Sequence, residues 1–456
     1  MLIIISDIHL GDGTCAKSIT PAAFQLFGDR LEELARNASL RSDGKYRPLD
    51  TIDILMLGDI LDPLHSIRWL DQNPGESGYV RPWTDPHAPQ YAVKLNEITR
   101  AILKNNRESI AILKDLTQGS LTLPRVSMSG KMDREGHEIP VKVRLHYMVG
   151  NHDWYYHLPG PEFNTIRAEI VEVFGLSNSP EPFPHELKEK EATDLSSLLK
   201  SYRVYAQHGD LYDPFNYDKR KGRNASSLGD AFTVEILNRF PVEVERRLGS
   251  ELPPSFVESL RQLVNVRPAL ATPLWISSQL RQNNVPEDEQ KKLKHLWDEI
   301  SMKFLKLDFV KESNIPFKLD PVDGLETIIR LTDNVSFKTL DSLVVWIRKK
   351  FGSEDITFAA HALKEEAFLD RKAQFVVYGH IHHHEVVPLD SYPGIKYPTN
   401  QMYINSGTWH PYFDLAINKP EEQKFIPYQV LTYLCFHKGD ERQGRLFETW
   451  SGAFSD

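Results

Sequence analysis

The sequence has few of the features that mark secreted or membrane proteins. Only two of its 456 residues are cysteines, Cys15 and Cys435, which is too few for the disulfide framework of a small secreted domain. No apolar run approaches the roughly 20 residues that a membrane span requires. The first residues, MLIIISDIHL, lack a basic leader and are too short an apolar stretch for a signal sequence. These absences predict a cytoplasmic protein with reduced thiols and no membrane partner.

Positive charge is also scarce relative to negative charge. The chain has 54 Lys and Arg residues against 63 Asp and Glu residues, which gives a formal net charge of −9. That sign does not favour nucleic acid as a partner, although a local basic patch would escape the count. A hydrophobic content of 41% and a charged content of 26% are typical of a globular chain. The length allows one large domain or two to three ordinary ones.

Short apolar segments predict buried strands. Between the first two of them, Thr20-Pro21 is a typical helix start, and Phe24, Phe27 and Leu31 follow with helical spacing. Strands that alternate with helices indicate an α/β layered fold. The five predicted strands are residues 2–5, 52–57, 145–149, 204–206 and 375–378.

Two long stretches interrupt this pattern. Residues near 64–143 contain a predicted helix with Leu95, Ile98 and Ile102 on one face, between loop-like flanks. Residues 215–369 are predicted to be mainly helical, with apolar stripes at 256–264, 293–304 and 340–347. The helix boundaries predicted there are Thr272-Pro273, Ser336 and Gly352. We expect a discontinuous core of residues 1–214 and 370–456 and a helical insertion, 215–369, that acts as a lid or specificity module. The alternative is that these are ordinary helices of the core.

Polar side chains follow each of the five predicted strands. In chain order, the strands lead into SDIHLGDG, GDILD, GNHD, QHGD and GHIHHH. Ligands of open α/β sheets bind beyond the carboxyl ends of strands, so these groups are expected to meet. Asp7 and His9 are two residues apart, and a regular strand would point both to the same side. Carboxylates and imidazoles without cysteine suit Mn, Fe, Zn, Co or Ni, so the pattern predicts a centre of two divalent transition-metal ions.

These segments resemble the motifs of the calcineurin-like metallophosphoesterase superfamily. The family pattern is D-x-H, GD-x-x-D, GNH-D/E, a lone H before G, and G-H-x-H, and all five parts are present in order. The resemblance covers roughly residues 1–63, 144–214 and 374–410 and says nothing specific about the two interrupting stretches. It implies a β-sandwich flanked by helices. It also implies a phosphoric ester hydrolase with two metal ions, Mn²⁺ foremost, whose nucleophile is a hydroxide that bridges the metals.

The resemblance further implies a role for each motif residue. The implied ligands form two sets: Asp7, His9 and His382 for one metal ion, Asn151, His208 and His380 for the other, and Asp59 for both. His152 would be the general acid or charge stabiliser, and Asp62 would orient it. The structural alternatives are a hydrogen-bonding His152 beside the site and a solvent-facing turn residue at Asp62.

The motifs exclude some substrate classes and leave others open. Protein Ser/Thr phosphatases of the superfamily carry Arg where Pro63 stands and Glu where Asp153 stands, which argues against that branch and favours a phosphodiester. Lipid A pathway hydrolases share SDIHLGD, HGD and NSGTW but usually carry Arg in place of His152. The alternatives are a nuclease on DNA or RNA, a phosphomonoesterase, and a scaffold with a vestigial metal site whose insertion binds a protein partner. For a nuclease, DKRKGR at 218–223 is the best basic candidate, although a solvated loop is the simpler interpretation. The sequence assigns no substrate-binding residue.

Several residues beside the motifs have alternative interpretations. Asp210 either fixes the tautomer of His208, meets the substrate, or lies in a plain turn. Asn405 either supports the ligand loops or ends a strand. His383 and His384 extend the imidazole run and are expected at the surface or behind the ligands. The aromatic residues that either wall the substrate or pack locally are Trp154, Tyr155, Tyr156 and Trp409. Cys15 is interpreted as a bystander thiol.

Overall fold

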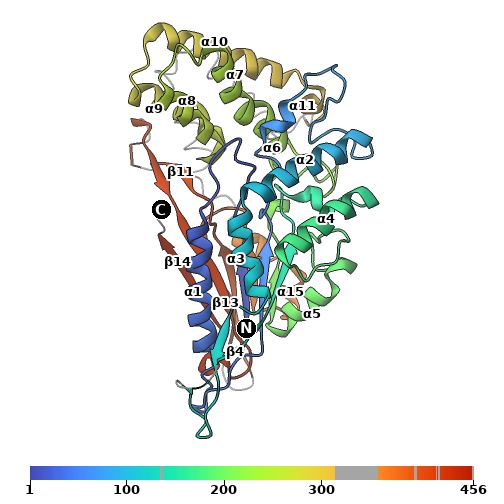
Figure 1. Ribbon diagram of the computed structural model, residues 1–456, viewed down its shortest axis with the longest axis vertical. Coiled ribbons are helices and arrows are strands. Elements are labelled where there is room, and N and C mark those ends of the chain that lie inside the picture. Colours follow the sequence, from blue (N-terminus) through green and yellow to red (C-terminus); the bar gives the residue numbers. More distant parts are fainter. Residues whose placement is uncertain are drawn as a thin grey trace.

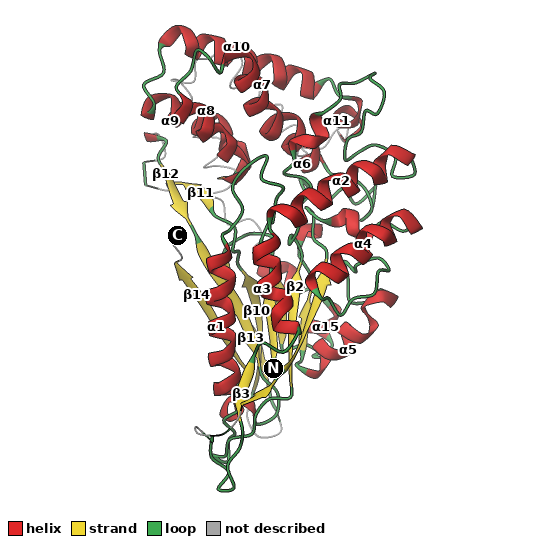
Figure 2. Cartoon of the chain, viewed as in Figure 1, coloured by secondary structure: helices red, strands yellow, loops and turns green. Residues whose placement is uncertain are grey.

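The computed structural model describes residues 1–133, 136, 138–313, 358–394, 398–416, 418–419 and 422–453. The chain is a mixed α/β protein with several sheets, flanked by helices, and a further group of helices lies beyond one end of the sheets (Figure 2). The two largest sheets position the candidate site.

The first sheet has five strands in the order β14-β13-β1-β2-β5. β1 pairs in parallel with β2, with Leu2 opposite Asp53, and β2 pairs in parallel with β5. β13 pairs antiparallel with the other side of β1, and β14 closes that edge. The carboxyl ends of β1, β2 and β5 therefore lie at one edge of the sheet. The bounds are β1 Leu2–Ile5, β2 Thr51–Leu57, β5 Lys142–Met148, β13 Val430–Phe436 and β14 Phe447–Ala453.

The second sheet has four strands in the order β6-β8-β10-β9. β6, β8 and β10 run in parallel, and β9 pairs antiparallel with β10. The two sheets pack face to face, because Leu2 and Ile4 of β1 share a buried apolar cluster with Phe375 and Val377 of β8. The bounds are β6 Val204–Ala206, β8 Phe375–Tyr378, β9 His384–Tyr392 and β10 Thr399–Ser406.

Helices cover the outer faces of both sheets. Ile3 and Ile5 of β1 point away from the second sheet, because side chains alternate along a strand, and they join a buried cluster with Phe24 and Phe27 of α1 (Pro21–Ala38). α2 (Pro89–Asn105), α3 (Arg107–Thr117) and α4 (Pro161–Phe174) contribute to the same cluster. Burial of each such Phe or Ile stabilises the fold by about 1.5–3 kcal/mol. On the second sheet, α14 (Phe358–Ala362) and α15 (Glu366–Leu369) pack against β8 and β10, and α5 (Thr193–Ser201) lies beside β6.

Residues 215–313, called the helical segment below, form a separate apolar cluster. Figure 1 shows helices α7 to α11 gathered at one end of the molecule, beyond the strands. A two-residue strand, β7 (Val266–Arg267), leaves this group and pairs in parallel with β11 (Tyr412–Leu415), which also pairs with β12 (Phe425–Tyr428). The other elements are α6 Leu228–Phe232, a π-helix Thr233–Asn238, α7 Arg239–Leu248, α8 Pro254–Leu260, α9 Thr272–Gln282, α10 Glu287–Leu305 and α11 Asp308–Ser313. A small hairpin of β3 (Thr122–Pro124) and β4 (Glu138–Pro140) lies elsewhere.

The structure confirms the five predicted strands and the helix starts at Pro21 and Thr272. The apolar residues of 293–304 are buried from α10, as expected. The stripe at 256–264 is not a single helix, because the chain passes from α8 into a 3₁₀ helix at Arg261–Asn265. The predictions for 340–347, Ser336 and Gly352 lie outside the described residues. The division into a discontinuous core and a helical insertion stays a prediction. None of the helices in the described ranges has the length and apolar character needed to cross a bilayer.

Candidate metal centre

All seven predicted ligands lie in loops at the carboxyl ends of strands, and the folding of the two sheets brings them together. β1 leads into Asp7 and His9, β2 into Asp59, and β5 into Asn151. From the second sheet, β6 leads into His208, and β8 leads into His380 and His382. All are buried except His380, which is partly exposed. Side chains separated by up to 375 residues in the sequence thus line one site.

The first set contains Asp7, His9 and His382. His9 Nε2 lies 3.1 Å from His382 Nε2, and Asp7 Oδ1 lies 3.4 Å from His382 Nε2. His9 Nδ1 donates to Asp62 Oδ2 at 2.8 Å, and burial lowers the pKa of His9, so its Nε2 is free to act as a ligand. These three ligand atoms could hold one metal ion.

The second set contains Asp59, Asn151, His208 and His380. Asn151 Oδ1 lies 2.9 Å from His380 Nδ1 and 3.2 Å from His208 Nε2. Asp59 Oδ2 lies 3.2 Å from His208 Nε2 and 3.8 Å from His9 Nε2, so Asp59 faces both sets. A carboxylate in this position has lone pairs for two metal ions at once.

The hydrogen bonds of His208 test whether these residues fit a cation. Its Nδ1 lies 2.9 Å from the Leu57 carbonyl oxygen, which can only accept, so Nδ1 carries a hydrogen. Nε2 then faces two further acceptor oxygens, from Asp59 and Asn151. Burial opposes a charge on His208, but Asp59 and Asp7 outweigh it and raise the pKa of His208 well above its ordinary value. The space between His208, Asp59 and Asn151 therefore favours a positive charge. A metal ion bound there would supply that charge.

His380 is oriented by a carboxylate that the sequence analysis missed. Its Nδ1 faces Asn151, while its Nε2 lies 3.1 Å from Asp213 Oδ2. A carboxylate on the outer nitrogen fixes the tautomer of a metal-binding imidazole and makes the inner nitrogen a better ligand. Asp213 follows the fourth motif by only a few residues, in HGDLYD, but no spacing rule pointed to it.

The orientation of Asp7 and His9 is set by the backbone conformation of a loop, and not by the alternation of side chains along a strand. Asp7 and His9 were expected to share one side of a regular strand, and this is wrong, because β1 ends at Ile5. Both residues adopt the left-handed region, with φ of 51° and 52°, as do three further predicted ligands: Asp59, His380 and His382. Non-glycine residues rarely adopt such φ values, and they cluster at functional sites where the surroundings enforce them.

The motif glycines make room for the ligands. A Cβ at Gly58, where φ is +84°, would lie 2.5 Å from His208 Nδ1. At Gly150 it would lie 2.6 Å from His208 Cδ2, and at Gly379 it would lie 2.6 Å from Asp7 Oδ2. The glycines of the GD, GNH and GH motifs therefore allow backbone and ligands to approach closely.

Asp62 is fully buried and contacts three imidazoles, so it is not a solvent-facing turn residue. Its Oδ2 lies 2.8 Å from His9 Nδ1, 2.8 Å from His65 Nδ1 and 3.1 Å from His152 Nδ1. Burial would raise the pKa of Asp62, but the nearby histidines lower it well below its ordinary value and keep it a carboxylate. His65 was missed by the sequence analysis, although it stands only three residues after Asp62, in DPLH.

His152 stands at the edge of the ligand group with one nitrogen committed. Nδ1 contacts both oxygens of Asp62 at 3.1 Å, and its backbone N–H donates to Asp59 Oδ1 at 2.8 Å. Burial disfavours the imidazolium, but Asp62 and Asp59 outweigh it and raise the pKa of His152 to about 9. An imidazolium with a free Nε2 can donate a proton or stabilise negative charge.

Asp153 and Asn405 support the loops. Asp153 accepts from the backbone N–H of Gly150 at 2.6 Å and of Ile60 at 2.9 Å, so it ties the third motif to the second. Asn405 donates to the Gly379 carbonyl at 2.7 Å, which favours the interpretation that it supports a ligand loop.

Other residues beside the motifs have structural partners. Asp210 does not contact His208 Nδ1, which is bonded to Leu57; instead Asp210 pairs with Arg223 at 2.7 Å. The basic cluster 218–223 is thereby partly neutralised, since Arg220 also pairs with Asp218. The four aromatic residues considered for a substrate wall, Trp154, Tyr155, Tyr156 and Trp409, are buried in the apolar cluster of the first sheet.

The remaining imidazoles and the thiol near the motifs are also accounted for. His384 bonds the Asn405 carbonyl, and His383 is half-exposed beside Tyr412. Cys15 contacts Asn238, and burial raises the pKa of its thiol, which fits a bystander.

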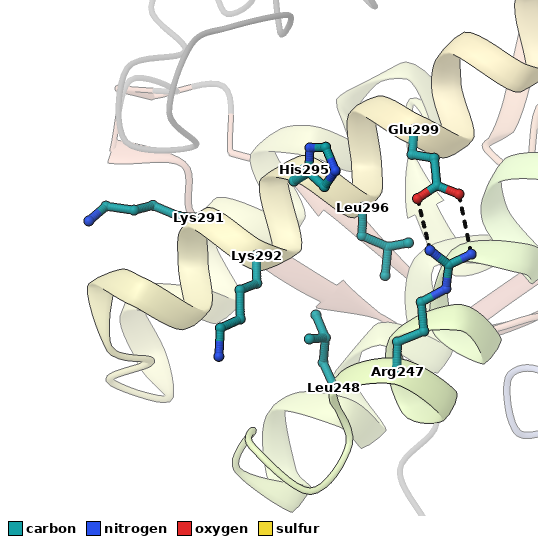
Figure 3. Close-up of a pocket in the computed structure, with 7 residues that line it drawn as sticks. All are labelled: Arg247, Leu248, Lys291, Lys292, His295, Leu296 and Glu299. Carbon is teal, nitrogen blue, oxygen red and sulfur yellow. Dashed lines mark hydrogen bonds and ion pairs between the residues drawn. The ribbon is translucent and has the colours of Figure 1, made fainter.

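Two features lie apart from this centre. Cys435, His437 and Glu448 form a separate buried group on β13 and β14, in which Glu448 already pairs with Arg442 at 3.3 Å. A pocket of about 420 Å³ lies between α7 and α10, where Arg247 pairs with Glu299 at 2.8 Å (Figure 3). It contains none of the predicted site residues.

No protein-family model matches the chain, and no curated protein sequence matches it significantly. The assignment of a function therefore depends on the motifs and on the geometry described above.

Proposed function

We propose that the chain is a metal-dependent phosphoesterase of the calcineurin-like metallophosphoesterase superfamily, with a phosphodiester as the preferred substrate class. The observation that carries the proposal is the pair of ligand sets joined by Asp59, in which acceptor atoms from five strand ends face one another. The face-to-face sheets with helices on both outer faces are consistent with that family's layering.

In the proposed reaction, the two ligand sets hold the metal ions and His152 acts on the substrate. Two divalent ions held by the two sets, Mn²⁺ foremost and Fe, Zn, Co or Ni as alternatives, would polarise the phosphoryl group and activate a water molecule. Asp62 holds His152 by Nδ1, no described residue bonds Nε2, and the pKa of about 9 keeps a proton on His152 at neutral pH. His152 would give that proton to the departing oxygen or stabilise charge on the phosphoryl oxygens, effects that contribute about 10²- to 10⁴-fold.

Metal analysis tests the site. The purified protein, loaded with Mn²⁺, is expected to hold close to two ions, and His208→Ala is expected to lose at least one, because His208 Nε2 faces both Asp59 and Asn151. His295→Ala, in α10 of the helical segment, is the matched control and should keep both ions. A wild-type protein without metal under these conditions would contradict the proposal.

A substrate panel with Mn²⁺ separates the candidate activities. It comprises a phosphomonoester, a model diester, cyclic nucleotides, and single-stranded DNA and RNA. Hydrolysis of the model diester supports the proposal. Cleavage of the nucleotide chains would select the nuclease, which the partly neutralised cluster at 218–223 does not favour. Inactivity on every substrate would favour a scaffold that binds a protein partner.

A further inference from the structure

The helical segment brings the strand that carries Arg267 close to the candidate metal centre. Arg267 ends β7, where it lies opposite Asp414 of β11. Two residues earlier, Asn265 Oδ1 is hydrogen-bonded to His410 Nε2 at 2.6 Å, and the His410 ring lies 5.0 Å from the ring of His9. The strand that carries Arg267 is therefore tied to His410, which lies beside His9.

No carboxylate of the described residues forms an ion pair with Arg267. Its Nη1 donates to the carbonyl oxygens of Val264 at 2.9 Å and Val266 at 3.1 Å, which fixes the side chain against its own backbone. Within the described ranges, it makes no ion pair and no other hydrogen bond. Burial lowers the pKa of Arg267, and neighbours such as Tyr412 and Asp62 only partly oppose that effect. Asp62, Asp414 and Asp7 are near enough to oppose the effect of burial, but none of them forms an ion pair with Arg267.

Other arginines that are withdrawn from solvent in this protein are compensated in different ways. Arg167, which is fully buried, forms no ion pair within the described ranges, but its Nε, Nη1 and Nη2 all donate to carbonyl or amide oxygens, whereas Arg267 uses only Nη1. Arg81 Nε pairs with Glu235 at 2.7 Å, and Arg223 Nη1 pairs with Asp210 at 2.7 Å. A guanidinium is seldom withdrawn from water without an anion, and its planar fork matches the oxygens of a phosphate. The missing anion at Arg267 is consistent with a ligand.

His65 adds a second donor on the same side of the centre. Its Nδ1 is held by Asp62, and Nε2 makes no hydrogen bond within the described ranges. The His65 ring lies 4.9 Å from that of His152 and 6.1 Å from that of His9. Burial lowers the pKa of His65, and the charges of His152 and Arg267 lower it further against the effect of Asp62. Arg267 and His65 therefore share the side of the centre where His9 and His152 lie.

We infer that Arg267 and His65 bind a second phosphate group of the substrate, next to the phosphate that is cleaved. The inference rests on the proposed function, in which the two metal ions and His152 already serve the scissile phosphate. Arg267 and His65 are then available to a neighbouring anionic group of the substrate. The substrate class would then be esters with two neighbouring phosphate groups.

The test compares the binding of two probes to the Mn²⁺-loaded protein by calorimetry. Pyrophosphate carries a second phosphate group, and orthophosphate does not. Arg267→Gln is expected to weaken pyrophosphate binding by about 10- to 100-fold, as for the loss of a hydrogen bond to a charged group, and to change the Kd of orthophosphate by less than about twofold. An equal loss for both probes, or no loss for either, would overturn the inference.

Matched variants guard against loss of folding. Arg261→Gln alters an exposed arginine six residues away that pairs with Glu245, and it should leave both Kd values unchanged. Arg267→Lys keeps the charge but loses the fork, so an intermediate effect is expected. His65→Asn keeps a donor toward Asp62 but removes Nε2, and it should selectively weaken pyrophosphate binding. If Arg267→Gln does not fold, the test uses Arg267→Lys and His65→Asn. An unchanged ratio of the Kd values for pyrophosphate and orthophosphate in both of these variants would overturn the inference.

The two proposals fail in different ways. If the phosphoesterase assignment is wrong, the wild-type protein holds no metal ions or cleaves none of the model esters. If only the second phosphate site is wrong, the wild-type protein binds metal and cleaves a model diester, and the ratio of the two Kd values is the same in Arg267→Gln as in the wild type.

Discussion

Among single residues, Asp62 orients three of the imidazoles at the candidate centre, His9, His65 and His152. The motif implied only that it orients His152, whereas it also accepts from His9 Nδ1 at 2.8 Å and contacts His65 Nδ1 at 2.8 Å. Asp62 therefore acts on a predicted metal ligand as well as on the predicted catalytic group. The two roles can be separated by substitution.

At this scale we predict different results for Asp62→Asn and His152→Asn. His152→Asn should keep both metal ions and lower the turnover of a model diester by about 10²- to 10⁴-fold, because it removes only the proton donor. Asp62→Asn should lower turnover and also weaken metal binding by about 10- to 100-fold, because His9 loses the carboxylate that orients it. Metal titration and steady-state kinetics measure both effects.

The control is His157→Asn, which alters a histidine that contacts Asn224 and Glu189 outside the ligand group. Both its metal content and its turnover should match the wild type. Equal metal affinity in Asp62→Asn and the wild type would show that Asp62 does not orient His9.

At the scale of elements, the loops after the strands position the ligands. β1, β2 and β5 end at one edge of the first sheet, and β6 and β8 end beside them in the second. The sheets alone do not aim the side chains; turns with left-handed residues and closely packed glycines do. Substitution of a glycine in such a turn should therefore affect metal binding more than a similar substitution elsewhere.

We predict that Gly58→Ala loses at least one metal ion and most activity, because the new Cβ would displace His208 or Gly150. Gly78→Ala is a matched control, since Gly78 has φ of +82° against +84° at Gly58 but nothing within 4 Å of an added Cβ. Both changes place alanine in the left-handed region, at about 1–2 kcal/mol in the free energy of unfolding. Chemical denaturation measures the backbone strain that both variants share. Metal content measures the displacement of His208 or Gly150, which only Gly58→Ala should cause. Loss of metal in both variants would contradict the explanation.

At the scale of the whole molecule, the centre joins parts of the chain that are distant in sequence. Asp7 and His382 lie 3.4 Å apart, and the backbone N–H groups of Trp409 and His410 donate to the Asp7 carbonyl. The helical segment is connected through Asn265 and β7. Metal ions bound between such segments would stabilise the folded chain, because the unfolded chain cannot assemble the ligands.

Removal of metal is therefore expected to destabilise the protein. A ligand at 100 times its Kd stabilises the folded state by about 2.7 kcal/mol per site. Treatment with EDTA should lower Tm by about 5 °C or more, with recovery on addition of Mn²⁺, as measured by thermal unfolding. His208→Ala should show a smaller response than the wild type. An unchanged Tm in a wild-type sample known to have contained metal would contradict this prediction.

The sequence predicted the strands and the candidate ligands because both depend on local signals. Apolar runs marked β1 and β8, and the polar residues that follow marked the sites of Asp7 and His380. Local signals failed where a partner comes from elsewhere. Asp213 bonds His380 across 167 residues, and no pattern in its own loop indicates that contact. The apolar stripe predicted at 256–264 is mostly buried, but the change from α8 to a 3₁₀ helix within it was not predicted.

By itself, the sequence determined which residue types stand at the ends of the strands, and hence the kind of chemistry that the site favours. Side-chain chemistry and strand-forming runs are properties of short stretches, which is why they can be interpreted without coordinates. Only the tertiary structure decided that Asp62 is shared by three histidines, that Asp210 pairs with Arg223, and that β7, which carries Arg267, pairs with β11. Hydrogen bonds and ion pairs form between groups that are close in space, and the packing of two sheets and the pairing of β7 with β11 set that closeness.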